Sequence, residues 1–173
     1  MRIILIAIAG AFVLAYLLGG SMPHHSAALD KIHQKVNEEN FSVYRKSVIH
    51  AAINVSGQQQ LQPLLAGIDQ VENVTLEGKR NNKPMLDEFE SGLKQEGYEV
   101  LLSMRSGSTT DVLWAKSSEG SDLILNPVYL KRDTVSSQLT AVYGKVDMKD
   151  AGTLSQLMAL RDFATGNDWI QAP

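Results

Sequence analysis

Hydrophobic residues are unevenly distributed along the chain, and the first block of them stands apart from the rest. Met1 and Arg2 precede an uncharged apolar run of sixteen residues, Ile3 to Leu18, which Gly19-Gly20-Ser21 follows. A positive charge, an apolar run and then small residues are typical of an export signal or an N-terminal membrane anchor. A membrane-spanning helix needs about twenty residues, so residues 1–21 fit either a cleaved signal peptide or a retained anchor.

Several later segments show the apolar spacing of amphipathic helices, after a short linker at residues 22–27. Leu29, Ile32 and Val36 fall on one helical face between Ala28 and Asn40, with charged residues elsewhere. The other predicted helices run from a cap at Ser47 to Ile53, around Leu61 to Ile68, from Pro84 to just before Gly97, and from a cap at Asp150 through Leu160.

Apolar and β-branched residues in short runs predict six strands. These runs are bounded by turn residues such as Ser106-Gly107-Ser108. Asn126-Pro127 interrupts one run and predicts an edge, a bulge or a break there, because proline cannot donate to a ladder. The polar segment Gly78 to Lys83 is interpreted as a basic loop. The predicted strands are Phe41–Arg45, Val71–Glu77, Tyr98–Arg105, Asp111–Lys116, Leu123–Leu130 and Leu139–Val146.

The order of these elements predicts the fold class. Helices alternate with strands early in the chain, and strands follow one another late, which favours an antiparallel meander. We expect one α+β domain over residues 28–163, with a mainly antiparallel sheet, helices on one face and a ferredoxin-like character. Residues 164–173 are expected to form a tail, in which Trp169 and Ile170 could dock.

Composition narrows the possible functions. The 173 residues carry a net charge of -3, so no basic excess predicts nucleic-acid binding. Cysteine is absent, which excludes thiol catalysis, thiolate metal sites and lipid attachment through cysteine. The segment Leu17-Leu18-Gly19-Gly20-Ser21 resembles a bacterial lipoprotein box in which serine replaces the acylated cysteine.

Four segments, taken in order, resemble a bacterial exported family whose domain has no known function. They are Leu64–Asp69, Val71–Leu76, Glu96–Leu101 and Val142–Asp150, the last containing a Gly-x-Ile/Val-Asp element before the final helix. The resemblance covers about Leu29 to Leu160 and implies a small exported α+β domain, often a lipoprotein. It supplies no catalytic residues. Ser21 and the Asn126-Pro127 interruption depart from the family pattern.

No residue is predicted to be catalytic, cofactor-binding or metal-binding. His24, His25, His33 and His50 lack a metal-ligand spacing such as His-Glu-x-x-His. Carboxylates in the first turn of the helix that begins at Pro84 are explained by the helix dipole rather than by acid–base chemistry; they are Asp87, Glu88 and Glu90.

These observations lead to a hypothesis about function and an alternative. We expect an exported, periplasmic or envelope-associated protein whose domain binds a partner protein without catalysis, since a sheet edge can recruit another strand. Residues 3–18 would tether it to the membrane if they are retained. The alternative is a hydrolase-like enzyme with an unfamiliar Asp/Glu/His site, which a deep pocket with carboxylates converging on His50 would favour.

Overall fold

A computed structural model describes residues 26–77, 79–118 and 120–166. The predicted signal or anchor, most of the linker and the segment from residue 167 to 173 lie outside these described residues. Within the described ranges no helix has both the length and the apolar character needed to cross a membrane.

The chain forms four α-helices, three short 3-10 helices and six strands in the described part. The α-helices are α2 (Ala27–Lys35), α3 (Lys46–Ser56), α4 (Lys79–Gln95) and α5 (Ala151–Thr165), and the 3-10 helices are η1 (Glu38–Asn40), η2 (Gln59–Leu61) and η3 (Leu64–Gly67). The strands are β1 (Phe41–Arg45), β2 (Ile68–Glu77), β3 (Glu99–Ser106), β4 (Thr109–Ser117), β5 (Leu123–Arg132) and β6 (Ser136–Asp147).

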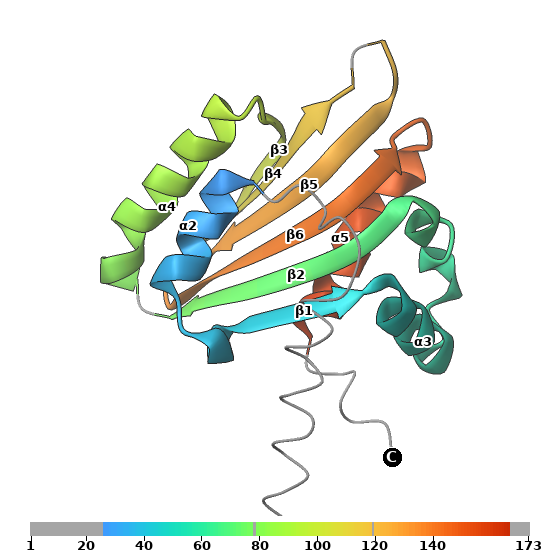
Figure 1. Cartoon of the computed structure of the whole chain (residues 1–173), viewed down its shortest axis with the longest axis horizontal. Coiled ribbons are helices and arrows are strands. Elements are labelled where there is room, and N and C mark those ends of the chain that lie inside the picture. Colours follow the sequence, from blue (N-terminus) through green and yellow to red (C-terminus); the bar gives the residue numbers. More distant parts are fainter. Residues whose placement is uncertain (1–25, 78, 119, 167–173) are drawn as a thin grey trace, which may run out of the picture.

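All six strands form one sheet in the order β1-β2-β6-β5-β4-β3, and every neighbouring pair is antiparallel. The predicted α+β class and antiparallel sheet are therefore confirmed. Strands β1 and β3 form the two opposite borders of the sheet (Figure 1). The four strands from β3 to β6 follow one another across the sheet, which differs from the split β-α-β arrangement of a ferredoxin-like fold.

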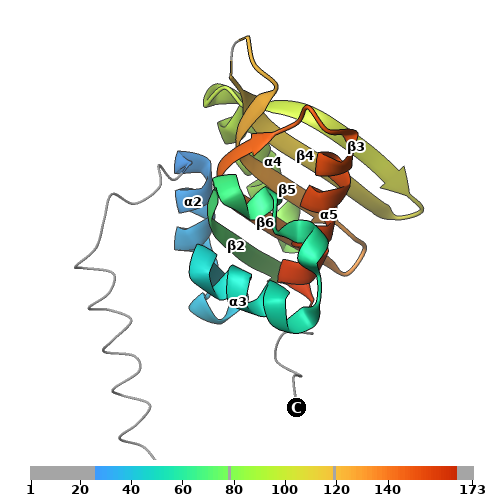
Figure 2. The ribbon, with the colours of Figure 1, turned by 90° about the vertical axis from the view of Figure 1, so that its right-hand side faces the viewer.

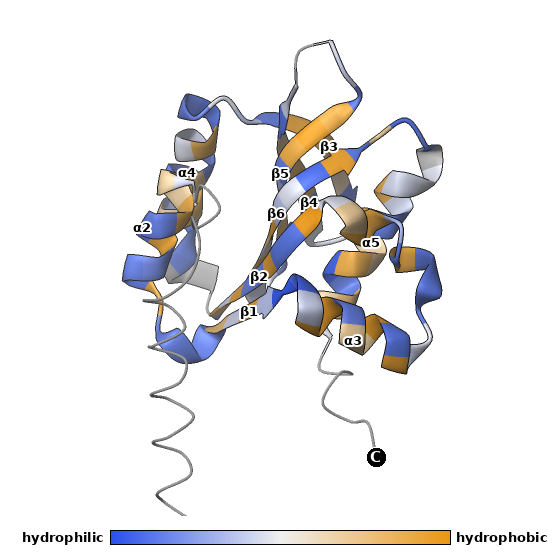
Figure 3. Ribbon diagram, turned by 45° about the vertical axis from the view of Figure 1, so that its right-hand side comes forward, coloured by the Kyte–Doolittle hydropathy of each residue, from blue (hydrophilic) through white to orange (hydrophobic). Residues whose placement is uncertain are grey.

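Helices cover both faces of the sheet, whereas the sequence predicts helices on one face. Figure 3 shows α2 and α4 on one side and α3 and α5 on the other. The cause lies in the strands, because β2 directs Val74 into the core under α2 and α4 and Val71 into the core under α3 and α5. In β6, Leu139 and Val142 divide in the same way. Successive side chains of a strand point to opposite faces, so an apolar strand requires cover on both.

Several predicted boundaries shift in the structure. Helix α4 begins at Lys79 and contains Pro84, so part of the predicted basic loop is helical. Helix α3 begins one residue before Ser47 and has no side-chain cap. The predicted cap of α5 is confirmed, since Asp150 accepts a hydrogen bond from the backbone of Gly152. Helix α5 extends beyond residue 163 and buries Ala164, so the domain reaches into the predicted tail.

The proline-interrupted strand contains a bulge, one of the three predicted outcomes. The register of β5 against β6 shifts between Leu125 and Val128, and Asn126 adopts a positive φ of 47°. Its side-chain Oδ1 accepts a hydrogen bond of 2.9 Å from the backbone N–H of Gly144. A Cβ at Gly144 would lie 2.1 Å from the carbonyl oxygen of Gly67. The close approach of these two backbone segments therefore requires glycine at position 144.

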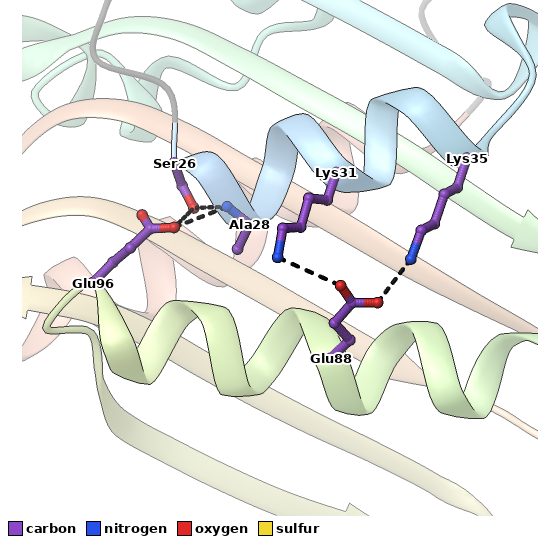
Figure 4. Close-up of polar contacts among 6 residues, drawn as sticks. All are labelled: Ser26, Ala28, Lys31, Lys35, Glu88 and Glu96. Carbon is purple, nitrogen blue, oxygen red and sulfur yellow. Dashed lines mark hydrogen bonds and ion pairs between the residues drawn. The ribbon is translucent and has the colours of Figure 1, made fainter.

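The N-terminal end of α2 is hydrogen-bonded to the residue that follows α4. The hydroxyl of Ser26 accepts hydrogen bonds from the first turn of α2. Glu96, the residue directly after α4, accepts hydrogen bonds of 3.1 Å from that hydroxyl and 2.8 Å from the backbone N–H of Ala28 (Figure 4). This Ser26–Glu96 cap satisfies amide groups that a helix start otherwise leaves unpaired.

Candidate functional site

The outermost strand β3 is exposed along nearly its whole length. Seven of its eight residues are exposed and only Leu102 is half-buried. Three of the exposed side chains are large and apolar: Val100 is 46%, Leu101 is 39% and Met104 is 36% exposed. Figure 2 shows β3 as the outer border of the sheet. An exposed, apolar edge strand is a template for pairing with another chain.

The hairpin between β3 and β4 determines which backbone groups of β3 face outward. Ser106 and Thr109 lie directly opposite each other across a two-residue turn, and such a turn is closed by a hydrogen-bonded pair. Bonded and non-bonded pairs alternate along an antiparallel ladder. The backbone N–H and C=O groups of Ser103 and Arg105 therefore point away from β4. A bulge between Val100 and Leu102 limits the regular edge to the C-terminal part of β3.

A polar cleft of about 340 Å³ lies near the opposite border of the sheet. Its floor is the α3 and α5 face of three adjacent strands, where the side chains of Ser42 and Asn73 are paired across β1 and β2, and those of Thr75 and Gln138 across β2 and β6. The end of α5, with Thr165, forms another wall. The cleft and β3 therefore occupy separate ends of the sheet.

The same sheet face changes from apolar to polar where α5 ends. In β2, Val71 belongs to the core under α3 and α5, whereas Asn73 lines the cleft. Asn73 is only 7% exposed, and its Nδ2 donates a hydrogen bond of 2.5 Å to the carbonyl of Ala164 at the end of α5. Among the described residues, no donor reaches its buried Oδ1.

A buried acidic group lies on the other face of the sheet, under α2. Glu72 is 1% exposed in its side chain, forms an ion pair with Nε2 of His33, and accepts a 3.0 Å hydrogen bond from the hydroxyl of Tyr143. The hydrogen bond to Glu72 raises the pKa of His33 above its usual 6.5, against the opposing effect of burial. Burial, with the nearby Glu72 charge, raises the pKa of the Tyr143 hydroxyl.

This cluster does not lie in the cleft. The cleft is lined by Asn73 and by the strand positions that share its face, while Glu72 points to the face of α2 and α4. An acid–base cluster needs contact with a bound substrate to act. The arrangement of Glu72 with His33 and Tyr143 is accounted for by the need to pair a buried carboxylate.

The carboxylates considered from sequence are engaged in surface ion pairs. Glu88 on α4 binds Lys31 and Lys35 of α2 at 3.4 and 2.7 Å, which lowers its pKa, the hydrogen bond to Lys35 being the largest cause (Figure 4). Asp87 pairs with Lys83 at 2.6 Å, and that hydrogen bond lowers the pKa of its carboxyl.

The remaining sequence candidates do not converge. Glu90 binds Arg132 at 2.6 Å. His50 lies on α3, across the sheet from the α4 carboxylates. His24 and His25 lie outside the described residues. No group of three or more potential ligands that could hold a metal ion occurs in the part of the chain that the structure describes.

Sequence reasoning does not single out Glu72 or Gln138, and it considers Asn73 only as part of a chance match to the glycosylation pattern Asn-x-Ser/Thr, at Asn73-Val74-Thr75. One signal was available in the segment Val71 to Leu76, where two polar residues stand inside an otherwise apolar strand. Such positions are buried or face a cleft, and both outcomes occur here. The pairing of Thr75 with Gln138 follows only from the register of the sheet.

Comparisons with known proteins were negative: the sequence matches no protein-family model and no curated protein significantly. The resemblance to an exported bacterial family therefore stays a prediction.

Proposed function

We propose that this domain is a non-catalytic binding module of the cell envelope, which captures an extended segment of a partner protein at the edge strand β3. The observation that carries the proposal is the exposure of β3 on both faces, including Val100, Leu101 and Met104. Soluble domains usually protect a long apolar edge by shortening or covering it. Here seven register pairs join β3 to β4 on one side, and the other side is open among the described residues.

Strand addition accounts for the combination of groups at this border. The outward N–H and C=O groups of Ser103 and Arg105 would form the main-chain ladder with a partner strand. The exposed apolar side chains of β3 would then pack against alternate side chains of that strand. In such complexes the backbone supplies affinity and the side-chain positions supply specificity.

The proposal includes export and membrane attachment, and the support for both comes from the sequence alone. Residues 1–21 have the pattern of a signal or anchor, and the predicted kinship to exported domains agrees with an envelope partner. A hydrolase-like activity has weaker support, because the groups considered for acid–base chemistry lie away from the cleft. His33 and Glu72 pair with each other under α2, the carboxylates of α4 form ion pairs, and His50 does not line the cleft.

Photocrosslinking in the cell envelope tests the proposal. A photoreactive amino acid at Leu101 is expected to capture a specific protein, whereas one at Val135, which is 75% exposed in another part of the surface, is not. Replacing Ser103 with proline removes one outward N–H, which an edge strand tolerates. We expect this variant to lower capture at least about tenfold, corresponding to about 1.4 kcal/mol.

Ser103→Thr is the matched control, because threonine keeps the N–H and suits a strand. Its capture should equal that of the unmodified chain. Circular dichroism of both variants verifies the fold. Absence of any specific product at Leu101, or equal products at Leu101 and Val135, would contradict strand addition at β3.

A further inference from the structure

The cleft at the other end of the sheet has the chemistry of a small-molecule site. We propose that it binds a neutral saccharide unit. Its volume of about 340 Å³ lies within the range of ligand pockets, roughly 300–1,000 Å³. This site is independent of the edge strand β3 and would persist if strand addition proved wrong.

The lining is rich in uncharged groups that both donate and accept hydrogen bonds. Amides and hydroxyls in this arrangement match sugar hydroxyls, each of which also donates and accepts. Tyr44 adds an aromatic side chain against which the C–H face of a sugar ring can pack. The amides are Asn40, Asn73 and Gln138, and the hydroxyls are Ser42, Thr75 and Thr165.

Asn73 provides the cleft with a polar side chain that is held in a fixed position. The side chain is more than nine-tenths buried and is held by its hydrogen bond to the carbonyl of Ala164. Its Oδ1 remains without a donor among the described residues. A buried acceptor without a partner is unfavourable, so a small shift of the Asn73 amide toward a hydroxyl bound in the cleft would relieve a cost that the folded domain otherwise carries.

The charge of the cleft lining determines which kinds of sugar it can accept. The described lining contains no lysine, arginine or histidine, and its charged side chain is the carboxylate of Glu39. The C-terminal end of α5, at Thr165 and Gly166, adds the partial negative charge of a helix end. Phosphorylated or carboxylated sugars are therefore disfavoured, whereas neutral sugars and amino sugars are accepted.

Ligand-observed NMR tests this inference on the full chain in a detergent without a sugar headgroup. The probes are N-acetylglucosamine, glucosamine with its amine protonated, and glucose 6-phosphate. We expect saturable binding of the first two and at least about tenfold weaker binding of the phosphate, because a negative ligand meets a negative site.

A positive charge introduced into the cleft supplies the decisive variant. Gln138→Lys places a cation in the lining and is expected to shift the preference toward glucose 6-phosphate about tenfold relative to N-acetylglucosamine. Gln70→Lys makes the same change on β2 outside the cleft and should leave the preference unchanged. Ser42→Lys, on the edge strand β1, repeats the test should Gln138→Lys fail to fold.

The proposal is overturned by any of three results. These are no saturable binding of N-acetylglucosamine, stronger binding of glucose 6-phosphate by the unmodified chain, or an equal shift in preference for Gln70→Lys and the cleft variants.

Discussion

Replacing His33 with alanine is expected to lower the free energy of unfolding by about 1.5–3 kcal/mol below pH 6.5, the range of a hydrogen bond to a charged group. The variant leaves the carboxylate of Glu72, which is 1% exposed, with the Tyr143 hydroxyl as its remaining described hydrogen-bond donor. Removing one partner of a fully buried ion pair costs about 3–5 kcal/mol. The His33 side chain keeps 30% exposure, so water reaches this pair and the smaller figure applies.

The same ion pair predicts how stability changes with pH. The Glu72 hydrogen bond raises the folded-state pKa of His33 above 6.5, with added contributions from the charges of Glu72 and Asp30. A raised pKa means that the folded state binds a proton more tightly than the unfolded state. The contribution of His33 is therefore fully present below pH 6.5 and is lost as the pH rises through its folded-state pKa.

Urea unfolding followed by circular dichroism, over pH values of about 5.5 to 8.5, measures this effect. Subtracting the free energy of unfolding of His33→Ala from that of the original chain at each pH removes the contribution of the other histidines. Glu72→Gln is the matched partner variant, because glutamine keeps the shape and loses the charge. Combining the two substitutions should show a coupling of about 1–3 kcal/mol. A difference between the original chain and His33→Ala that stays constant across this pH range would refute the reasoning.

Two further predictions concern the backbone. Gly144→Ala should cost at least about 3 kcal/mol in denaturant unfolding, because its Cβ would lie 2.1 Å from the carbonyl oxygen of Gly67; Gly57→Ala, at a φ of 74° with open space around it, should cost only about 1–2 kcal/mol. Equal losses would contradict the close-approach argument. Ser26→Ala should cost about 1 kcal/mol and speed hydrogen exchange in the first turn of α2, whereas Glu96→Gln, which keeps an acceptor, should have a smaller effect; unchanged exchange in Ser26→Ala would exclude the cap.

Local patterns in the sequence predict the elements well and their boundaries less well. Alternation and turn residues identify all six strands, and Asp150 correctly predicts the start of α5. The start of α4 was misplaced at Pro84, because the polar residues before it lack an apolar period. Backbone hydrogen bonding can extend a helix through such residues without any apolar signal.

The arrangement of the helices depends on information that no single segment contains. The apolar residues of β2 lie on both of its faces, but sequence alone does not show whether one or two layers of helices cover them. Likewise, the cleft unites Thr75 with Gln138, which are far apart along the chain and meet only through the β2–β6 register. The pairing of His33 with Glu72 arises from the packing of α2 on that sheet.

The fastening of α2 to the rest of the domain has a mechanical consequence. Tension that arrives from the chain ahead of Ser26 enters the fold at one end of this helix, and the Ser26–Glu96 cap carries the load first. The Lys31–Glu88 ion pair follows, then the pair of His33 with Glu72, and the Lys35–Glu88 pair comes last. Because these fastenings lie in series, a pull detaches α2 from one end in successive steps. The load reaches the sheet at Glu72 of β2 only after the Ser26–Glu96 cap and the Lys31–Glu88 pair have opened, so the first part of α2 protects the cleft and β3 from small pulls.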